Sequence, residues 1–159
     1  MSSRNAIGVA LLNIMVLCSC AGPQPPSYRP VADNKDLMKS VIDPQADIVW
    51  ESVKTTITAA GIEEKIPKTA QEWAAVRNAA IILAESGNLL MMPPRAKGGA
   101  DWMKYSRELI DVSEAAIRAA DAKDPKRIYE IGGDINDKCM QCHEQYDPTV
   151  RRDLGKPPL

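Results

Sequence analysis

Three residues near the C-terminal end have side chains and a spacing that could bind a porphyrin. Cys139, Cys142 and His143 form a Cys-x-x-Cys-His pattern, which is typical of the attachment of a c-type haem. Each thiol can add to one vinyl group of the haem, and the two intervening residues let both sulfurs reach their vinyl groups. The imidazole of His143 would then lie beneath the ring, where a neutral nitrogen can bind the iron. The motif predicts one covalent haem c.

Alternative roles for these side chains are less well supported. His143 is the only histidine in the chain, and a single histidine in a helix can be an ordinary surface or core residue. Two cysteines and one histidine leave a tetrahedral zinc site one ligand short. A thioredoxin-type Cys-x-x-Cys lies near a βαβ pattern, which the sequence lacks.

The N-terminal residues 1–19 predict a lipoprotein signal peptide. Residues 7–17 are mostly apolar, and these 11 residues are too few to span a bilayer as a helix, which needs about 20. The sequence that follows resembles the lipobox of bacterial lipoproteins, with Cys20 at the acylated position. Cys18 fits that position less well because the bulky Leu17 precedes it. An ordinary cleaved signal peptide is the alternative.

The cysteine count agrees with separate roles for the N-terminal and the C-terminal cysteines. Cleavage before Cys20 would remove Cys18, and Cys20 would carry the lipid. Cys139 and Cys142 would carry the haem, so no thiol would remain for a disulfide in an oxidising compartment. We therefore expect a lipid-anchored protein on the periplasmic side of a bacterial membrane. The outer membrane is favoured because Ala21, rather than aspartate, follows the lipidated cysteine.

The remaining chain divides into a tether, a domain and a tail. Residues 20–33 are rich in proline, and about 13 residues of extended chain would reach about 40 Å. Residues 34–150 are expected to form the cytochrome c domain, and residues 151–159 a flexible tail. With 20 basic and 21 acidic residues, the net charge of −1 gives no support for nucleic-acid binding.

The first helix of the domain is expected in two pieces. Residues 35–42 form a short helical segment, and Asp43-Pro44 reads as an N-cap with proline at the first helical position of the next segment. An apolar face follows and ends near Gly61; it consists of Val49, Trp50, Val53 and Ile57. We expect both pieces to act as one kinked helix.

Capping signals and apolar spacing predict three further helices. Thr69 and Glu72 match a capping box that opens the second helix, which stops at Pro93. Gly98-Gly99 precedes the third helix, and Asp124-Pro125 opens the fourth. The apolar stripe of the fourth helix comprises Ile128, Ile131, Ile135, Cys139 and Cys142. This spacing places both cysteines on the core side.

Four helices with short connections predict an all-α fold, an antiparallel up-down-up-down four-helix bundle with covalently bound haem. That topology brings the haem motif beside the start of the first helix, the end of the second and the start of the third. The methionines outside the motif fall at those ends: Met38, Met91, Met92 and Met103. We expect them to pack around the haem pocket.

Residues 35–146 resemble the cytochrome c′ family, the class II c-type cytochromes. The resemblance rests on the four-helix pattern, the late position of the haem motif, and the match of residues 142–146 to Cys-His-x-x-Tyr. It implies that a methionine of the first helix binds the iron in low-spin members, and Met38 lies in such a pattern. Asp147 is a departure, because a basic residue usually follows the tyrosine. The resemblance also allows a homodimer.

Two functions are compatible with these features. The first is an electron carrier with iron bound by His143 and Met38, tethered to a membrane that also holds its redox partner proteins. The alternative is a five-coordinate haem protein that binds or senses NO or CO, with Met38 packing nearby. An enzyme is disfavoured because no second histidine can act as an acid or base. Arg95, Lys97 and Arg151 are expected to be solvated loop residues rather than partners of the haem propionates.

Overall fold

The computed structural model describes residues 28–155, which are mostly helical. The expectation of a helical fold is confirmed, with one exception, a β-hairpin after the first helix. Cys20 and the signal peptide lie outside the described residues. The elements are α1 (Asn34–Leu37), η1 (Met38–Ile42), α2 (Asp43–Trp50), β1 (Lys54–Thr58), β2 (Gly61–Lys65), α3 (Ala70–Met91), α4 (Ala100–Asp121), α5 (Pro125–Tyr146) and α6 (Pro148–Asp153).

The first helix is continuous, and it contains a π-helical turn. Asp33 caps its start, where the carboxylate accepts the backbone N–H of Asp36 at 2.8 Å. The predicted helix start at Asp43 is wrong, since Asp43 instead donates its N–H to the carbonyl of Met38 within the same helix. Proline in a helix interior removes a hydrogen bond and crowds the preceding turn, and the wider π turn before Pro44 accommodates it. The two pieces therefore form one helix, as expected.

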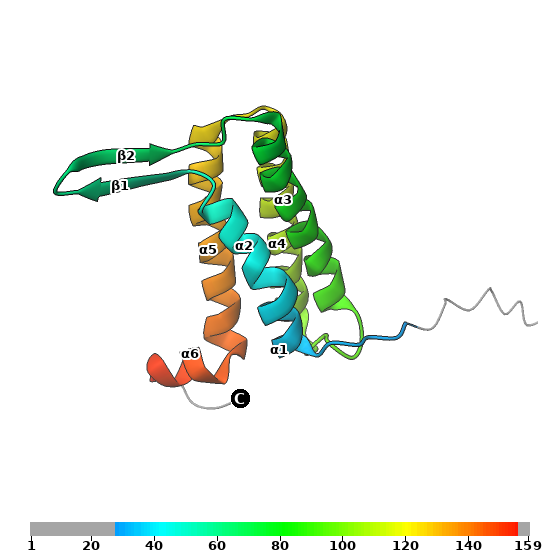
Figure 1. Cartoon of the computed structure of the whole chain (residues 1–159). Coiled ribbons are helices and arrows are strands. Elements are labelled where there is room, and N and C mark those ends of the chain that lie inside the picture. The colour runs from blue at the N-terminus through cyan, green and yellow to red at the C-terminus, as the bar shows by residue number, and fades with distance from the viewer. Residues whose placement is uncertain (1–27, 156–159) are drawn as a thin grey trace, which may run out of the picture.

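The prediction that this helix extends to Gly61 is also wrong. It ends at Trp50, and β1 and β2 follow as an antiparallel pair in which Ile57 lies opposite Ile62. Every residue of both strands is exposed. Figure 1 shows the hairpin as an arm that projects away from the helices. Gly61 allows the turn, because its φ of 138° suits glycine alone.

The helices α3, α4 and α5 begin where the sequence predicted. Thr69 and Glu72 form the capping box of α3: the Thr69 hydroxyl accepts the N–H of Glu72 at 3.1 Å, and the Glu72 carboxylate accepts the N–H of Thr69 at 2.8 Å. α4 follows Gly98 and Gly99, which have positive φ. Asp124 caps α5 by accepting the N–H of Arg127 at 3.0 Å.

The core lies between α2, α3, α4 and α5. α3 packs along α4, α4 packs against α5, and α2 contacts both α3 and α5. In Figure 1 the chain rises through α1 and α2, descends through α3, rises through α4 and descends through α5. The apolar stripe of α5 is buried at its centre, where Ile128, Ile131 and Ile135 are at most 1% exposed. Burial of such faces supplies the main stabilisation of the fold.

A close contact fixes α2 against α5. The indole Nε1 of Trp50 donates to the carbonyl oxygen of Gly132 at 2.8 Å. A Cβ atom at position 132 would lie 3.2 Å from Cδ1 of Trp50, so only glycine gives this approach without displacement. The contact sets the position of the first helix along α5, and so its position relative to the motif.

A close approach of α3 and α4 at Gly87 predicts a measurable loss of stability on substitution. A Cβ atom at Gly87 of α3 would lie 2.6 Å from the backbone oxygen of Ser106 in α4. Gly87→Ala should therefore force α3 and α4 apart and lower the free energy of unfolding by about 1–3 kcal/mol, as overpacking does. Urea unfolding would measure this change.

Gly133→Ala is the matched control. Nothing lies within 4 Å of a Cβ atom at position 133 in α5. The control should gain about 0.5–1 kcal/mol, because alanine loses less backbone entropy in a helix. Equal effects of the two substitutions would contradict the close approach of α3 and α4 at Gly87.

Candidate functional site

The three motif residues lie at the C-terminal end of α5. Cys139 and Cys142 continue the apolar stripe of this helix, but they are half-buried rather than buried. Cys139 packs against the hydrophobic core. Exposure therefore increases along the stripe from Ile135 to the motif. This arrangement leaves the sulfur atoms beside apolar surface and still within reach of a group that enters from outside.

The environment of the two cysteines favours uncharged sulfur. Burial raises the pKa of the Cys139 thiol to about 11, and the carboxylate of Asp43 adds to this effect. Burial likewise raises the pKa of Cys142 to about 11, with a further contribution from Cys139. Because the thiolate is the reactive form, these thiols are weak nucleophiles in the folded chain at neutral pH. The surroundings suit thioethers, which carry no charge.

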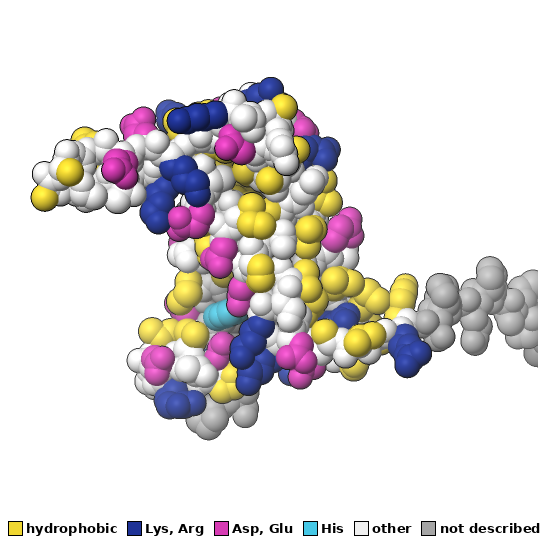
Figure 2. All heavy atoms as spheres, viewed as in Figure 1, with side chains coloured by type: hydrophobic (Ala, Val, Ile, Leu, Met, Phe, Trp, Pro, Cys, Tyr) yellow, Lys and Arg dark blue, Asp and Glu magenta, His cyan; other side chains and the backbone are white. Residues whose placement is uncertain are grey.

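His143 is partly exposed and has a defined neighbour on one side of its ring. Its Nδ1 atom lies 3.9 Å from Oδ2 of Asp147, and 33% of the side chain is exposed. In Figure 2 the histidine is visible at the surface, between the main helices and the lobe that contains α6. Since Nδ1 faces a carboxylate, Nε2 is the nitrogen left to bind a metal.

The first helix approaches the motif through Asp43. Burial raises the pKa of the Asp43 carboxyl, while the nearby His143 acts in the opposite direction. Asp43 also raises the pKa of Cys139, so its carboxylate lies close to both Cys139 and His143. The sequence suggested only a capping role for Asp43. Its position near the motif depends on how α2 packs on α5, which no local pattern reveals.

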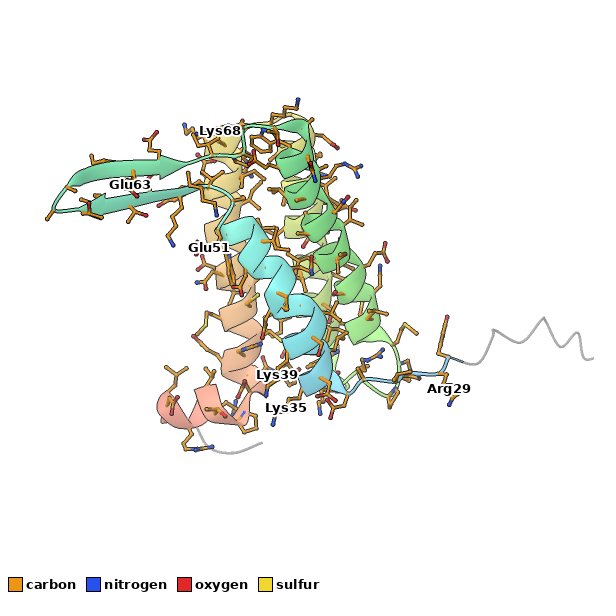
Figure 3. The ribbon with its side chains drawn as sticks, viewed as in Figure 1. Arg29, Lys35, Lys39, Glu51, Glu63 and Lys68 are labelled. Carbon is orange, nitrogen blue, oxygen red and sulfur yellow. The ribbon has the colours of Figure 1, made fainter. Side chains whose placement is uncertain are left out.

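Met38 lies one π-helical turn before Asp43. Its carbonyl accepts the N–H of Asp43, and its half-buried side chain packs against the core. π-helical turns inside helices are frequent at functional sites. In Figure 3, Lys35 and Lys39, which flank Met38, lie at the same end of the molecule as α6. The structure thus places Met38 at the end of the molecule that carries the motif.

Aromatic residues join α4 to α5 at this end. The rings of Trp102 and Tyr146 meet edge to face, with centroids 5.0 Å apart. The indole of Trp102 donates to the carbonyl of Leu90 at 2.8 Å, which links the start of α4 to the end of α3. The hydroxyl of Tyr105 donates to Oε1 of Gln145 at 3.1 Å. Tyr146, the tyrosine of the Cys-His-x-x-Tyr match, is therefore part of the frame around the motif.

Arg95 is buried, whereas the sequence predicted a solvated loop residue. It is only 8% exposed, and its Nε donates to the carbonyl of Ala32 at 3.1 Å. The side-chain amide of Asn34 donates to the carbonyl of Arg95 at 2.9 Å. Arg95 therefore fastens the segment before α1 to the connection between α3 and α4. Long-range packing, rather than sequence composition, determines this role.

The expected tail begins with helical structure. Arg151, Arg152 and Asp153 belong to α6, whereas the sequence predicted a flexible tail from residue 151. The guanidinium of Arg151 donates to the carbonyl of Gln145 at 3.1 Å, so it satisfies a carbonyl group in the last turn of α5. The physical reason for the helix is the Asp147-Pro148 pair, a capping signal like the one at Asp124-Pro125.

The structure brings most of the predicted site residues to one end of the molecule. Cys139, Cys142 and His143 lie together, and the first helix brings Met38 to the same end. Cys20 lies outside the described residues. Within residues 28–155, no group of three or more histidine, cysteine, aspartate or glutamate side chains is arranged to hold a metal ion. The porphyrin of a haem supplies its own ring nitrogens, so the iron requires only one or two protein ligands.

No protein-family model, curated protein or solved structure matches the chain. None of the helices in the described part of the chain is both long and apolar enough to cross a membrane.

Proposed function

We propose that this protein is a c-type cytochrome that carries electrons with one covalent haem. The observation that carries the proposal is the Cys-x-x-Cys-His motif at the end of α5, where two half-buried thiols adjoin a histidine with Nδ1 beside a carboxylate. Cys139 and Cys142 would hold the haem, and Nε2 of His143 would bind the iron. The haem supplies a reversible change between Fe(II) and Fe(III).

The surrounding residues have supporting roles in this proposal. Ile135, one helical turn before Cys139 in the apolar stripe of α5, is fully buried and would exclude water from the inner side of the site. Trp102 and Tyr146 hold the ends of α4 and α5 together. In this reading the helices form an antiparallel up-down-up-down bundle of the cytochrome c′ type, with the haem at the motif end.

Met38 is the proposed second ligand of the iron. Three observations support it: its place at the motif end, its half-buried side chain, and the π-helical turn that begins at this residue. Thioether sulfur is a soft ligand suited to haem iron, and coordination by methionine and histidine raises the reduction potential. With both positions filled, the iron would exchange electrons without a change of ligands.

The proposed location follows from the N-terminal sequence. Cys20 would carry acyl chains after removal of residues 1–19, and the proline-rich tether would connect the lipid to the domain. The partners would be redox proteins of the same membrane, where anchoring raises their effective concentration.

Covalent attachment gives the direct test of the proposed function. Protein expressed with a haem-attachment system should keep the haem mass on its polypeptide after denaturation and acid–acetone extraction, because thioether bonds survive both. The double substitution Cys139→Ala and Cys142→Ala should abolish this retention. Mass spectrometry and haem staining of denaturing gels would measure it. Cys18→Ala is the matched control and should retain the haem. Extraction of the haem from the unsubstituted protein would overturn the proposal.

A further inference from the structure

Asp147 occupies a fixed position between the two C-terminal helices. Its Oδ1 accepts the N–H of Thr149 at 2.7 Å and that of Val150 at 3.4 Å, so it caps α6. Its own N–H donates to the carbonyl of His143 at 2.8 Å, which completes the last turn of α5. Both its backbone and one carboxylate oxygen are therefore held in place.

The other carboxylate oxygen faces the histidine. Oδ2 of Asp147 lies 3.9 Å from Nδ1 of His143, and the two side chains are 36% and 33% exposed. This separation is too long for a direct hydrogen bond, but a charge at such a distance is felt strongly where water is partly excluded. Asp43 approaches His143 from the first helix, and Arg151 reaches the carbonyls of Glu144 and Gln145. Asp147 is the carboxylate whose oxygen lies within 4 Å of Nδ1.

We propose that Asp147 is a positioning residue that orients His143 and lowers the reduction potential of the haem iron bound to it. The inference rests on the proposed function. A carboxylate beside Nδ1 keeps the proton on that nitrogen and directs Nε2 to the metal. Its negative charge makes the imidazole a stronger electron donor to the iron, which favours Fe(III) over Fe(II). The carboxylate thus opposes the rise in potential that methionine coordination gives.

Asp147→Asn separates the electrostatic role from the structural one. Asparagine caps a helix about as well as aspartate, so α6 and the end of α5 should be retained. Redox titration of the holoprotein should show a higher reduction potential in the variant. In a Met38→Ala background, the iron–histidine stretching band in the resonance Raman spectrum of the ferrous protein should move to lower frequency, because the imidazole is a weaker donor.

Asp124→Asn is the matched control. Asp124 is also a helix N-cap followed by proline, and the same unit of charge is removed, but it lies at the opposite end of α5. The control should leave both the potential and the Raman band near their original values. Equal shifts in the two variants, or no shift in Asp147→Asn, would overturn the inference. Absence of covalent haem in the unsubstituted protein would instead overturn the proposed function, before any potential is measured.

Discussion

Replacing Met38 with alanine should change the haem iron from low-spin and six-coordinate to high-spin and five-coordinate. The thioether sulfur of Met38 would be the second protein ligand of the iron in the proposed site, and alanine has no atom that could replace it. The reduction potential should fall, because the sulfur favours Fe(II). The open position should then bind carbon monoxide in the ferrous state.

Absorption spectra of the ferric and ferrous protein would measure these changes. The unsubstituted ferric protein should show the weak near-infrared band of iron–methionine coordination, and Met38→Ala should lose it. Met103→Ala is the matched control, since Met103 is also half-buried and packs against the core at the motif end. The control should keep the band. An unsubstituted protein that is already high-spin in both oxidation states would contradict the ligand assignment and favour the gas-binding alternative.

Replacing Cys20 with alanine should release the protein from the membrane. Stable anchoring requires at least two lipid chains or an equivalent second signal, and the lipidated cysteine would supply all of them. Loss of this residue should move nearly all of the protein to the soluble periplasmic fraction. Membrane fractionation would measure the release, and mass spectrometry of the N-terminus would identify the acyl chains.

Cys18→Ala provides the matched control for anchoring. The substitution removes a cysteine two positions earlier in a segment that the mature chain is expected to lack. The control protein should remain in the membrane fraction. Recovery of the unsubstituted protein in the soluble fraction, with an unmodified N-terminus, would show that residues 1–19 are an ordinary cleaved signal peptide.

The starts of α3 and α5 were predictable because capping is a local property. The capping box of Thr69 and Glu72 and the Asp124-Pro125 pair involve residues within a few positions of each other, so their hydrogen bonds follow from the sequence alone. The hairpin was missed because Val49, Val53 and Ile57 keep a helical spacing across the true end of α2 at Trp50. The run of β-branched residues from Thr55 to Thr58 was the signal that could have identified the strand.

The candidate site was only partly predictable from the sequence. The spacing of Cys139, Cys142 and His143 carries its own chemical information, since it is the spacing that attachment of a c-type haem requires. The link between His143 and Asp147 could have been found, because residues four apart lie on the same face of a helix. The approach of Asp43 to the motif could not, because it depends on the packing of the first helix against α5 around Trp50 and Gly132.

The bond between Arg95 and Ala32 has a consequence for how the domain would be oriented in the cell. It holds the incoming chain at the motif end, so a lipid on the tether would draw that end toward the bilayer. Figure 1 shows the chain entering beside α1, while the hairpin projects from the opposite end. Electron transfer weakens steeply with distance, so this orientation would favour partners embedded in or resting on the membrane. The hairpin would face the aqueous compartment.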